Sequence, residues 1–233
     1  MPHSRFYIPK RFEKKVAVTI EDEEFHHLQR VMRHAVGDEV ELINGMGQLA
    51  KARVSAIGKR SGEVVVENVR TEEKQTKKII LALAFLKPNH FEIAIEKATE
   101  LGADAFWLFP GDRSEKKAVS ETYMTRLQTI VIGATKQCGR LFLPEISVRN
   151  DLKDCLQADL CLYGDVSEDA PKISEYTNKI GDESTTALLI GPESGFSEKE
   201  VTEMKRAGAV GITLHHNILR AETAAIVGML LLS

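Results

Sequence analysis

The segment Ala187-Leu-Leu-Ile-Gly-Pro-Glu-Ser-Gly-Phe-Ser197 decides the fold of the C-terminal part of this 233-residue chain. Its apolar start predicts a strand that is buried on both faces, and a loop with two glycines follows. Ser197 is the predicted N-cap of a helix over residues 198–207, with Glu200 at the capping-box position. Glycines let the backbone approach a ligand, and a helix N-terminus can bind an anionic group. The segment therefore predicts a strand, a ligand-binding loop and a helix.

The alternative for this loop is an ordinary strand-to-helix turn. Two specialised loops are excluded. No lysine follows the glycine as in a phosphate-binding P-loop. Ser194 adjoins Gly195, whereas the serine of a hydrolase nucleophile elbow stands midway between two glycines.

Further apolar runs alternate with helical segments on either side of this stretch. The predicted strands are residues 79–86, 105–109, 160–163, 187–190 and 210–214, and the predicted helices are 91–101, 120–137, 198–207 and 223–232. Such alternation predicts an α/β fold with a mostly parallel sheet. Ligands bind beyond the carboxyl ends of such strands, which nominates the loops after Phe109, Tyr163, Ile190 and Leu214.

The first 70 residues have a different rhythm, with short segments of alternating polarity and glycine-containing turns. Strands are predicted at residues 6–8, 16–20, 39–43, 49–57 and 64–69, and one helix at 22–33. This spacing predicts a small antiparallel β-barrel. The polar run 69–78 is typical of a linker, so we expect one domain over residues 1–72 and another over 73–233.

Composition and charge are those of a globular protein, with 43% hydrophobic and 28% charged residues. The longest apolar runs are far shorter than the roughly 20 residues of a membrane-spanning helix, and the start of the sequence lacks the apolar core of a signal peptide. Residues 1–78 carry 15 Lys and Arg against 12 Asp and Glu, and the remainder carries 16 against 22. We expect a cytoplasmic protein in which a mildly basic binding module is joined to an acidic domain.

Three cysteines, Cys138, Cys155 and Cys161, are an odd number without the spacing of a metal site. We expect them to be reduced thiols and expect no metal. His215 and His216 are adjacent, but no third ligand follows at a recognisable spacing.

A second loop, His215-His-Asn-Ile-Leu-Arg-Ala-Glu-Thr223, joins the last strand to the last helix. Ile218 and Leu219 are apolar between polar residues, as expected of side chains that line a pocket for a flat ring. Arg220, Glu222 and Thr223 fall where the helix begins. The alternative is a capped helix whose arginine and glutamate form a surface ion pair.

Other charged residues are candidates, each with a structural alternative. Glu92, Glu96 and Glu100 share a helical face, which is commonly a solvated one. Arg113 follows a predicted strand, and Arg140 follows the end of the long helix. In the barrel, the basic residues His26, His27, Arg30 and Arg33 would suit contact with RNA phosphates, although exposed basic residues are common.

Taken together, these pieces resemble the RsmE family of 16S rRNA uridine-N3 methyltransferases, of the SPOUT class, over nearly the whole chain. The matching stretches are Arg5-Phe-Tyr, His26-His27 with Val31-Met-Arg33 and Gly37-Asp38, Lys97-Ala-Thr-Glu-Leu-Gly102, Arg113-Ser114, Gln137-Cys-Gly-Arg140, Ile190-Gly-Pro-Glu193 and Ile218-Leu-Arg-Ala-Glu-Thr-Ala224. The resemblance implies a PUA-like RNA-binding barrel and an α/β domain tied in a trefoil knot, a rare exception to the usual rules of chain topology. It also implies S-adenosylmethionine as cofactor, 16S rRNA of the small ribosomal subunit as substrate, and a homodimer.

The resemblance assigns residues to three roles. The cofactor-binding candidates are Tyr163, Gly164, Ile190, Gly191, Pro192, Glu193, Gly195, Leu214, Ile218, Leu219, Arg220, Thr223 and Ala224. The RNA-binding candidates are Arg5, His26, His27, Arg30 and Arg33, and the catalytic candidates are Arg113, Arg140 and Glu100.

Three positions depart from the family pattern. Ser194 replaces a second consecutive glycine, His215 replaces a glycine before the Ile-Leu-Arg stretch, and Lys136 stands where an acidic residue is common. A positive φ at Ser194 would cost about 1 kcal/mol or more.

The hypothetical reaction transfers a methyl group to N3 of a uracil that is unpaired or flipped into the pocket. The enzyme must remove the N3 proton and stabilise the charge that spreads to O2 and O4. An arginine suits the second task because it is permanently charged and has several donors. Arg113 and Arg140 are the first candidates, and Arg220 and Arg5 are the second. Glu100 or Glu193 could orient groups or accept the proton.

Two other functions compete with this hypothesis. One is a catalytically silent RNA-binding ribosome-assembly factor, which the departure at Ser194 favours. The other is an NAD- or nucleotide-binding α/β enzyme, against which the absence of a Gly-x-Gly-x-x-Gly stretch after a strand counts.

Overall fold

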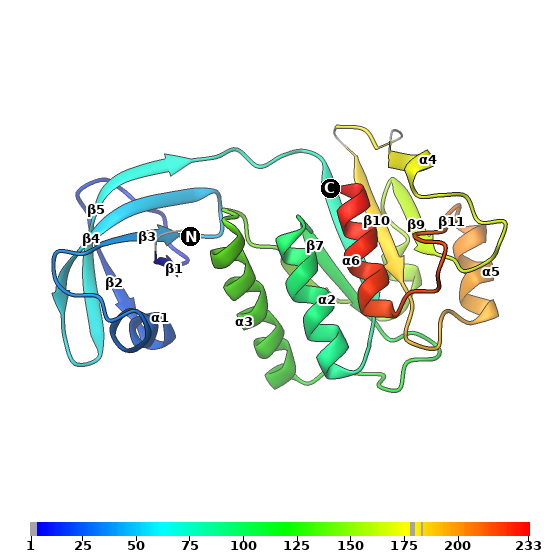
Figure 1. The fold of residues 1–233 in the computed structure, drawn as a ribbon, viewed down its shortest axis with the longest axis horizontal. Coiled ribbons are helices and arrows are strands. Elements are labelled where there is room, and N and C mark those ends of the chain that lie inside the picture. Colours follow the sequence, from blue (N-terminus) through cyan, green and yellow to red (C-terminus); the bar gives the residue numbers. More distant parts are fainter. Residues whose placement is uncertain (1–3, 178–179, 183) are drawn as a thin grey trace. The chain divides into compact units, whose positions relative to one another are not determined.

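The computed structural model describes residues 4–177, 180–182 and 184–233 (Figure 1). The chain forms two compact units. The first consists of residues 1–74 together with 135–143, and the second of residues 75–134 and 144–233. The prediction divides the chain once, after residue 72, whereas in the structure the segment 135–143 belongs with the first unit.

The first unit contains a curled five-stranded sheet in the order β1-β3-β4-β5-β2. Its strands are β1 (Arg5–Tyr7), β2 (Ala17–Glu21), β3 (Glu39–Ile43), β4 (Gln48–Ile57) and β5 (Ser61–Thr71). The pairs are antiparallel except β1 with β3, which is parallel. Alternate residues of these strands point into one apolar core, as the period of two predicts. Fully buried members include Phe6, Ile20, Leu42 and Val64.

A helix that changes its winding follows β2. The sequence predicts one α-helix over residues 22–33, but α1 (Asp22–His26) passes into a π-helical turn, η1 (His27–Val31). In that turn the Met32 N–H donates to the carbonyl oxygen of His27, five residues back. Phe25 and Leu28 are buried, which anchors the apolar side of this segment in the core. The single-helix prediction is wrong at its second half.

The segment 135–143 pairs with the turn between β3 and β4. The Gly47 N–H donates to the carbonyl oxygen of Leu141 at 2.9 Å, and the Leu143 N–H donates to that of Gly45 at 3.0 Å. Gly47 has a φ of +95°, and a Cβ there would lie 2.5 Å from the Phe142 ring. Only glycine therefore permits this close approach.

The second unit contains a six-stranded, entirely parallel sheet in the order β11-β9-β10-β6-β7-β8. Its strands are β6 (Lys78–Ala84), β7 (Ala105–Phe109), β8 (Glu145–Val148), β9 (Leu160–Gly164), β10 (Thr185–Ile190) and β11 (Val210–Ile212). Five of them match predicted runs. The edge strand β8 has four residues and no fully buried side chain, so it lacks the apolar run that identified the others.

The helices of this part of the chain are α2 (Pro88–Glu100), α3 (Glu121–Cys138), α4 (Ser174–Thr177), α5 (Glu198–Arg206) and α6 (Ala221–Leu232), with a short 3₁₀ turn, η2 (Lys153–Cys155). Helix α6 packs against α2, β6 and β10. The contact is close because Gly228 has no side chain where a Cβ would overlap Leu188. No helix in the described ranges is both long and apolar enough to cross a membrane.

Candidate active site

A cavity of about 680 Å³ lies at the carboxyl ends of β9, β10 and β11. Its walls are the segments 163–168, 190–196 and 213–219, completed by Arg113, Val201 and the first turn of α6. The sheet order explains this convergence, because β9 lies between β10 and β11 and all three strands point the same way. The loops that follow neighbouring parallel strands must meet at one edge of the sheet.

The wall at residues 190–196 is a tight turn. The Gly195 N–H donates to the carbonyl oxygen of Pro192 at 2.8 Å, and Gly195 has a φ of +71°. Ser194 is not among the described residues with positive φ. The glycine that this turn requires is thus Gly195, and Ser194 occupies the family's glycine position without backbone strain.

In the helix after this wall, α5, backbone N–H groups at the N-terminus are hydrogen-bonded within the chain. Ser197 Oγ accepts from the Glu200 N–H at 3.1 Å, and Glu200 Oε2 accepts from the Ser197 N–H at 2.7 Å. This is the predicted capping box. The expected anion site at the start of α5 is therefore already satisfied by the chain's own side chains.

The loop after β7 is fastened to the same wall. Ser197 Oγ donates to Asp112 Oδ2 at 2.7 Å, and the Asp112 N–H donates to Glu200 Oε1 at 2.9 Å. Arg113 donates from Nη1 to the carbonyl oxygen of Ser194 at 3.1 Å and lines the cavity. These contacts bring a permanently charged side chain to the pocket.

A third wall of the cavity consists of residues 163–168. From the sequence, this segment is predicted only as the end of a strand and the loop that follows it. Tyr163 is buried with the Phe196 ring edge-on at 6.1 Å, and burial is the main cause that raises the pKa of its hydroxyl. Asp165 accepts from the Ser167 N–H at 2.9 Å and from the Ser167 hydroxyl at 2.7 Å. An Asp-x-Ser stretch after a strand is the signal that could have identified this turn.

The wall at residues 213–219 is held by its own polar groups. The Asn217 N–H donates to His215 Nδ1 at 3.1 Å, and the Thr213 hydroxyl donates to the His215 carbonyl oxygen at 3.2 Å. Ile218 lines the cavity as predicted but is 82% exposed, so it lies at the mouth. Among the described residues no group of histidine, cysteine or carboxylate side chains could hold a metal ion.

The charges on the walls favour a cation. Asp165, Glu168 and Glu193 face the cavity, against the single guanidinium of Arg113. Burial by itself would raise the pKa of the Glu193 carboxyl, but hydrogen bonds from the Lys87 N–H, from its own N–H and from His90 hold that pKa below its usual value. Glu193 therefore keeps its negative charge, which opposes a phosphate-bearing ligand.

The family model described as "RNA methyltransferase domain" matches residues 72–233, and one described as "RNA methyltransferase PUA domain" matches residues 20–67. This chain belongs to the RNA methyltransferase family. The predicted fold, a SPOUT-type α/β methyltransferase domain with a parallel sheet and a PUA-like N-terminal domain, is confirmed.

Two named relatives and a solved structure illustrate the likeness. The ribosomal RNA small subunit methyltransferase E of Mesomycoplasma hyopneumoniae is 33% identical over 165 residues, which are 70% of this chain and 72% of the relative. The protein of the same name from Rickettsia conorii is 29% identical over 97% of this chain and 93% of its own. A putative methyltransferase from Legionella pneumophila, solved with bound S-adenosylmethionine, is 26% identical with a TM-score of 0.90, covering 98% of this chain and 96% of its own.

Within the methyltransferase domain, the structure gathers eleven of the thirteen cofactor-binding candidates around the cavity. They are Tyr163, Gly164, Ile190, Gly191, Pro192, Glu193, Gly195, Leu214, Ile218, Leu219 and Ala224. Arg220, the exposed N-cap of α6, and the half-buried Thr223 do not line it. Ser194, Asp165 and His215 also line it, although the sequence does not predict a cofactor contact for them.

Of the catalytic candidates, only Arg113 lines the cavity. Glu100 is the last residue of α2, whose first turn follows the carboxyl end of β6, so the length of the helix separates Glu100 from the cavity edge. Its carboxylate pairs with Lys97 Nζ at 2.8 Å. Arg140 belongs to the first unit.

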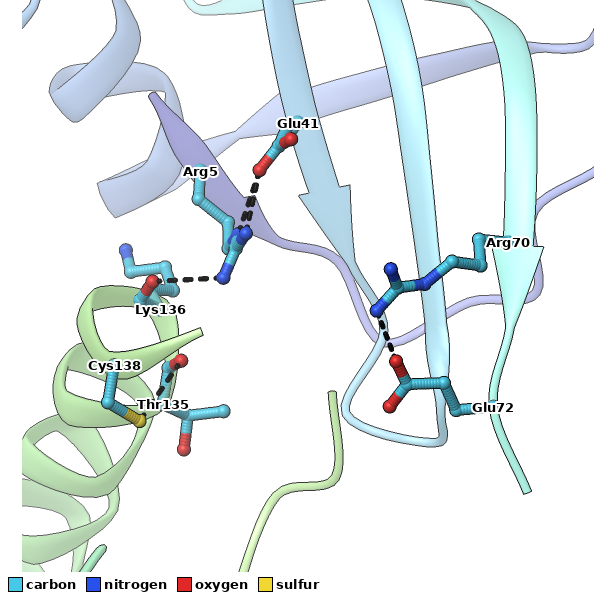
Figure 2. A network of polar contacts seen from close by, with 7 residues as sticks. All are labelled: Arg5, Glu41, Arg70, Glu72, Thr135, Lys136 and Cys138. Carbon is cyan, nitrogen blue, oxygen red and sulfur yellow. Dashed lines mark hydrogen bonds and ion pairs between the residues drawn. The ribbon is translucent and has the colours of Figure 1, made fainter. Parts of the chain in front are cut away.

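In the PUA-like unit, Arg5 has an intramolecular partner (Figure 2). Its guanidinium donates to Glu41 Oε2 from Nε at 3.2 Å and from Nη2 at 2.7 Å, and Nη1 donates to the Lys136 carbonyl oxygen at 3.4 Å. Lys136, one of the departures from the family pattern, pairs through Nζ with Glu24 at 2.7 Å. Burial and the Lys136 charge lower the pKa of His27.

Three of the remaining RNA-binding candidates are exposed. His26, Arg30 and Arg33 are exposed along α1, η1 and the residues just after them. Arg33 adopts a left-handed backbone with a φ of 56°, which ends the π-helical turn.

Proposed function

We propose that this chain transfers the methyl group of S-adenosylmethionine to N3 of a specific uridine in the 16S rRNA of the small ribosomal subunit. The observation that carries the proposal is an acidic cavity, formed by the segments 163–168, 190–196 and 213–219, in a domain of the RNA methyltransferase family. Relatives named ribosomal RNA small subunit methyltransferase E, and a Legionella pneumophila structure that contains S-adenosylmethionine, support it.

The residues at the cavity fit this cofactor. A volume of about 680 Å³ lies in the usual range for a small-molecule site. Ile218, Leu219 and Val166 offer apolar surface to a purine ring, and the carboxylates of Asp165 and Glu193 suit a positively charged sulfonium. All thirteen cofactor-binding candidates are retained in this proposal, with Arg220 and Thr223 acting through the start of α6.

When bound, S-adenosylmethionine supplies an electrophilic methyl group. The chain's own residues must hold the flipped uracil, accept the N3 proton and stabilise negative charge on O2 and O4. Arg113 stands at the cavity with a fixed charge and is the proposed donor to a uracil oxygen. The family resemblance also assigns Arg140 and Glu100 to catalysis, although neither lines this cavity, where Glu193 is a carboxylate.

The PUA-like domain, residues 1–72, is the proposed RNA-binding part, and residues 73–233 are the proposed methyltransferase domain. His26, Arg30 and Arg33 present exposed positive or protonatable side chains to phosphates. Arg5 and His27 complete the proposed set. Because the guanidinium of Arg5 is paired with Glu41, we propose that Arg5 mainly stabilises the PUA-like domain that carries these residues.

A homodimer is proposed from the surface of the last helix. Its inner face is buried, including Ala225, Gly228 and Met229, but Leu230 and Leu231 remain 58% and 40% exposed. Ile93 on the neighbouring helix α2 is 44% exposed. Exposed apolar side chains on packed helices favour a partner surface. Sedimentation that finds only monomer at micromolar concentration would contradict the dimer.

The deciding experiment measures methyl transfer from labelled S-adenosylmethionine to free 16S rRNA and to assembled small subunits, followed by nucleoside analysis. N3-methyluridine is the expected product. Calorimetry addresses the silent assembly factor, which would bind RNA without binding the cofactor. The unstrained backbone at Ser194 removes the reason that favoured that alternative.

A bacterial rRNA substrate also implies that the protein acts in the cytoplasm.

A further inference from the structure

His90 contacts the loop after β10 and the first turn of α6, which both border the cavity, although His90 does not line the cavity itself. It projects from the first turn of α2. Its Nδ1 lies 3.3 Å from Glu193 Oε1 and 3.8 Å from Glu222 Oε2. Glu193 belongs to the loop after β10, and Glu222 to the first turn of α6, directly after the second loop.

The carboxylate of Glu222 explains why a basic side chain at this position would matter. Its side chain is 11% exposed, and its Oε2 atom is buried without a hydrogen-bond partner. A buried carboxylate oxygen that lacks a partner costs free energy, and the imidazole of His90 lies 3.8 Å from this oxygen. The imidazole also satisfies Glu193 Oε1, which accepts a second hydrogen bond, of 2.9 Å, from the Lys87 N–H.

We propose that His90 is a positioning residue for the cofactor site, which holds the two cavity loops together by bridging the carboxylates of Glu193 and Glu222. The inference rests on the proposed function, because it concerns the site assigned there to S-adenosylmethionine. At the observed distances the Nδ1–H can donate only to Glu193, so any attraction between His90 and Glu222 must be electrostatic.

Three substitutions separate the hydrogen bond from the charge. His90→Ala removes both, His90→Asn keeps a donor near the position of Nδ1 without the charge, and His90→Lys keeps a positive charge. Asn89→Ala changes the preceding exposed residue of the same helical turn and is the matched control.

The first measurement needs no cofactor. Hydrogen exchange of peptides that cover residues 190–196 and 213–220 reports the opening of both loops. We expect His90→Ala to speed exchange about tenfold in both segments, the loss typical of one charge-assisted hydrogen bond, and His90→Lys to restore most of the protection. Unchanged exchange in both loops of a folded His90→Ala protein would overturn the proposal.

The second measurement is the dissociation constant for S-adenosylmethionine. We expect about a tenfold rise for His90→Ala, with kcat at saturating cofactor little changed, and a much smaller rise for His90→Lys. If His90→Lys behaves like His90→Ala, the charge has no role and the bridge to Glu222 is wrong. If the wild-type chain binds no S-adenosylmethionine, the proposed function fails while the exchange data still decide the role of His90.

Glu193→Gln keeps the test decisive should His90→Ala fail to fold. A bridge predicts that Glu193→Gln weakens cofactor binding and that His90→Asn in the Glu193→Gln background adds little further loss. Fully additive losses would show that the two side chains act separately and would overturn the proposal.

Discussion

The guanidinium of Arg113 and the backbone carbonyl of Ser194, 81 positions apart, are joined by a hydrogen bond of 3.1 Å. The bond fixes the loop after β7 to the wall of the cavity, which Arg113 also lines. Because Arg113 both supports the site and supplies charge to it, we expect activity to depend on the length and on the charge of this side chain.

Arg113 is accordingly the first target for kinetics. Replacement by alanine should lower kcat/KM at least about a hundredfold, because one preorganised charged donor to a developing oxyanion is typically worth that much. Arg113→Lys keeps the charge but loses the fork of donors and should recover only part of the rate. Single-turnover methyl transfer measures the effect, with Arg140→Ala assayed beside it. Near wild-type turnover in both alanine variants would show that the site assignment is wrong.

The turn at residues 192–195 predicts opposite outcomes for its neighbouring residues. Gly195→Ala should destabilise the protein by about 1 kcal/mol, since the φ of +71° is strained for a residue with a Cβ although the surrounding space is open. Ser194→Gly should change stability by less than about 0.5 kcal/mol, because Ser194 already has an unstrained backbone. Thermal unfolding of both variants tests this ranking, and equal losses would contradict it.

A third prediction concerns the contact between α6 and the sheet. Gly228→Ala places a methyl group against Leu188 in the centre of β10 and should cost about 1 to 3 kcal/mol. Leu188→Ala in the same protein should recover part of that loss by making room. The unfolding temperatures of the two single variants and the double variant give the comparison.

The ion pair of Arg5 and Glu41 yields a fourth prediction. Their side chains are only 10% and 11% exposed, so Arg5→Met would leave a nearly buried carboxylate alone and should cost about 3 kcal/mol. Replacing both residues by methionine should cost less than that single change. Denaturant unfolding followed in the PUA-like domain distinguishes the two. A double variant that is as unstable as Arg5→Met would mean that the lost contact to the Lys136 carbonyl dominates.

The three thiols should differ in reactivity. Burial raises the pKa of Cys155 to about 12 and also raises that of Cys161, whereas Cys138 is partly exposed. At pH 8 only about one Cys155 in ten thousand is a thiolate, so alkylation of the folded protein should modify Cys138 first. Raising the pH toward 10 should accelerate the alkylation of Cys155, provided that the protein stays folded. Mass spectrometry of peptides checks the order, and equal rates at pH 8 would contradict it.

The sequence predicts the parts of this fold that depend on local pattern. The apolar runs at β6, β7, β9, β10 and β11 follow from burial on both faces, and the turn at Gly195 follows from its neighbours. The two cavity loops were identified because a strand end, glycines and apolar residues stand together at each. For the same reason, eleven cofactor candidates line one cavity.

The remaining features depend on contacts between distant residues. The edge strand β8 is defined by pairing with β7, and the π-helical turn is defined by how Phe25 and Leu28 enter the core. Glu100 was chosen from a motif, but the direction of α2 places it away from the cavity edge. The role of Asp165 required knowing that β9 lies between β10 and β11.

Helix α3 has a consequence for how this protein can be divided. Its residues up to Ala134 belong to one unit, while Thr135 to Cys138 and the following stretch to Leu143 belong to the other. A polypeptide that stops at Lys74 would leave the Gly47 N–H and the Gly45 carbonyl without their partners. The PUA-like unit is continuous in space but interrupted along the sequence. Any exchange of this module between proteins must carry along nine residues encoded inside the catalytic domain.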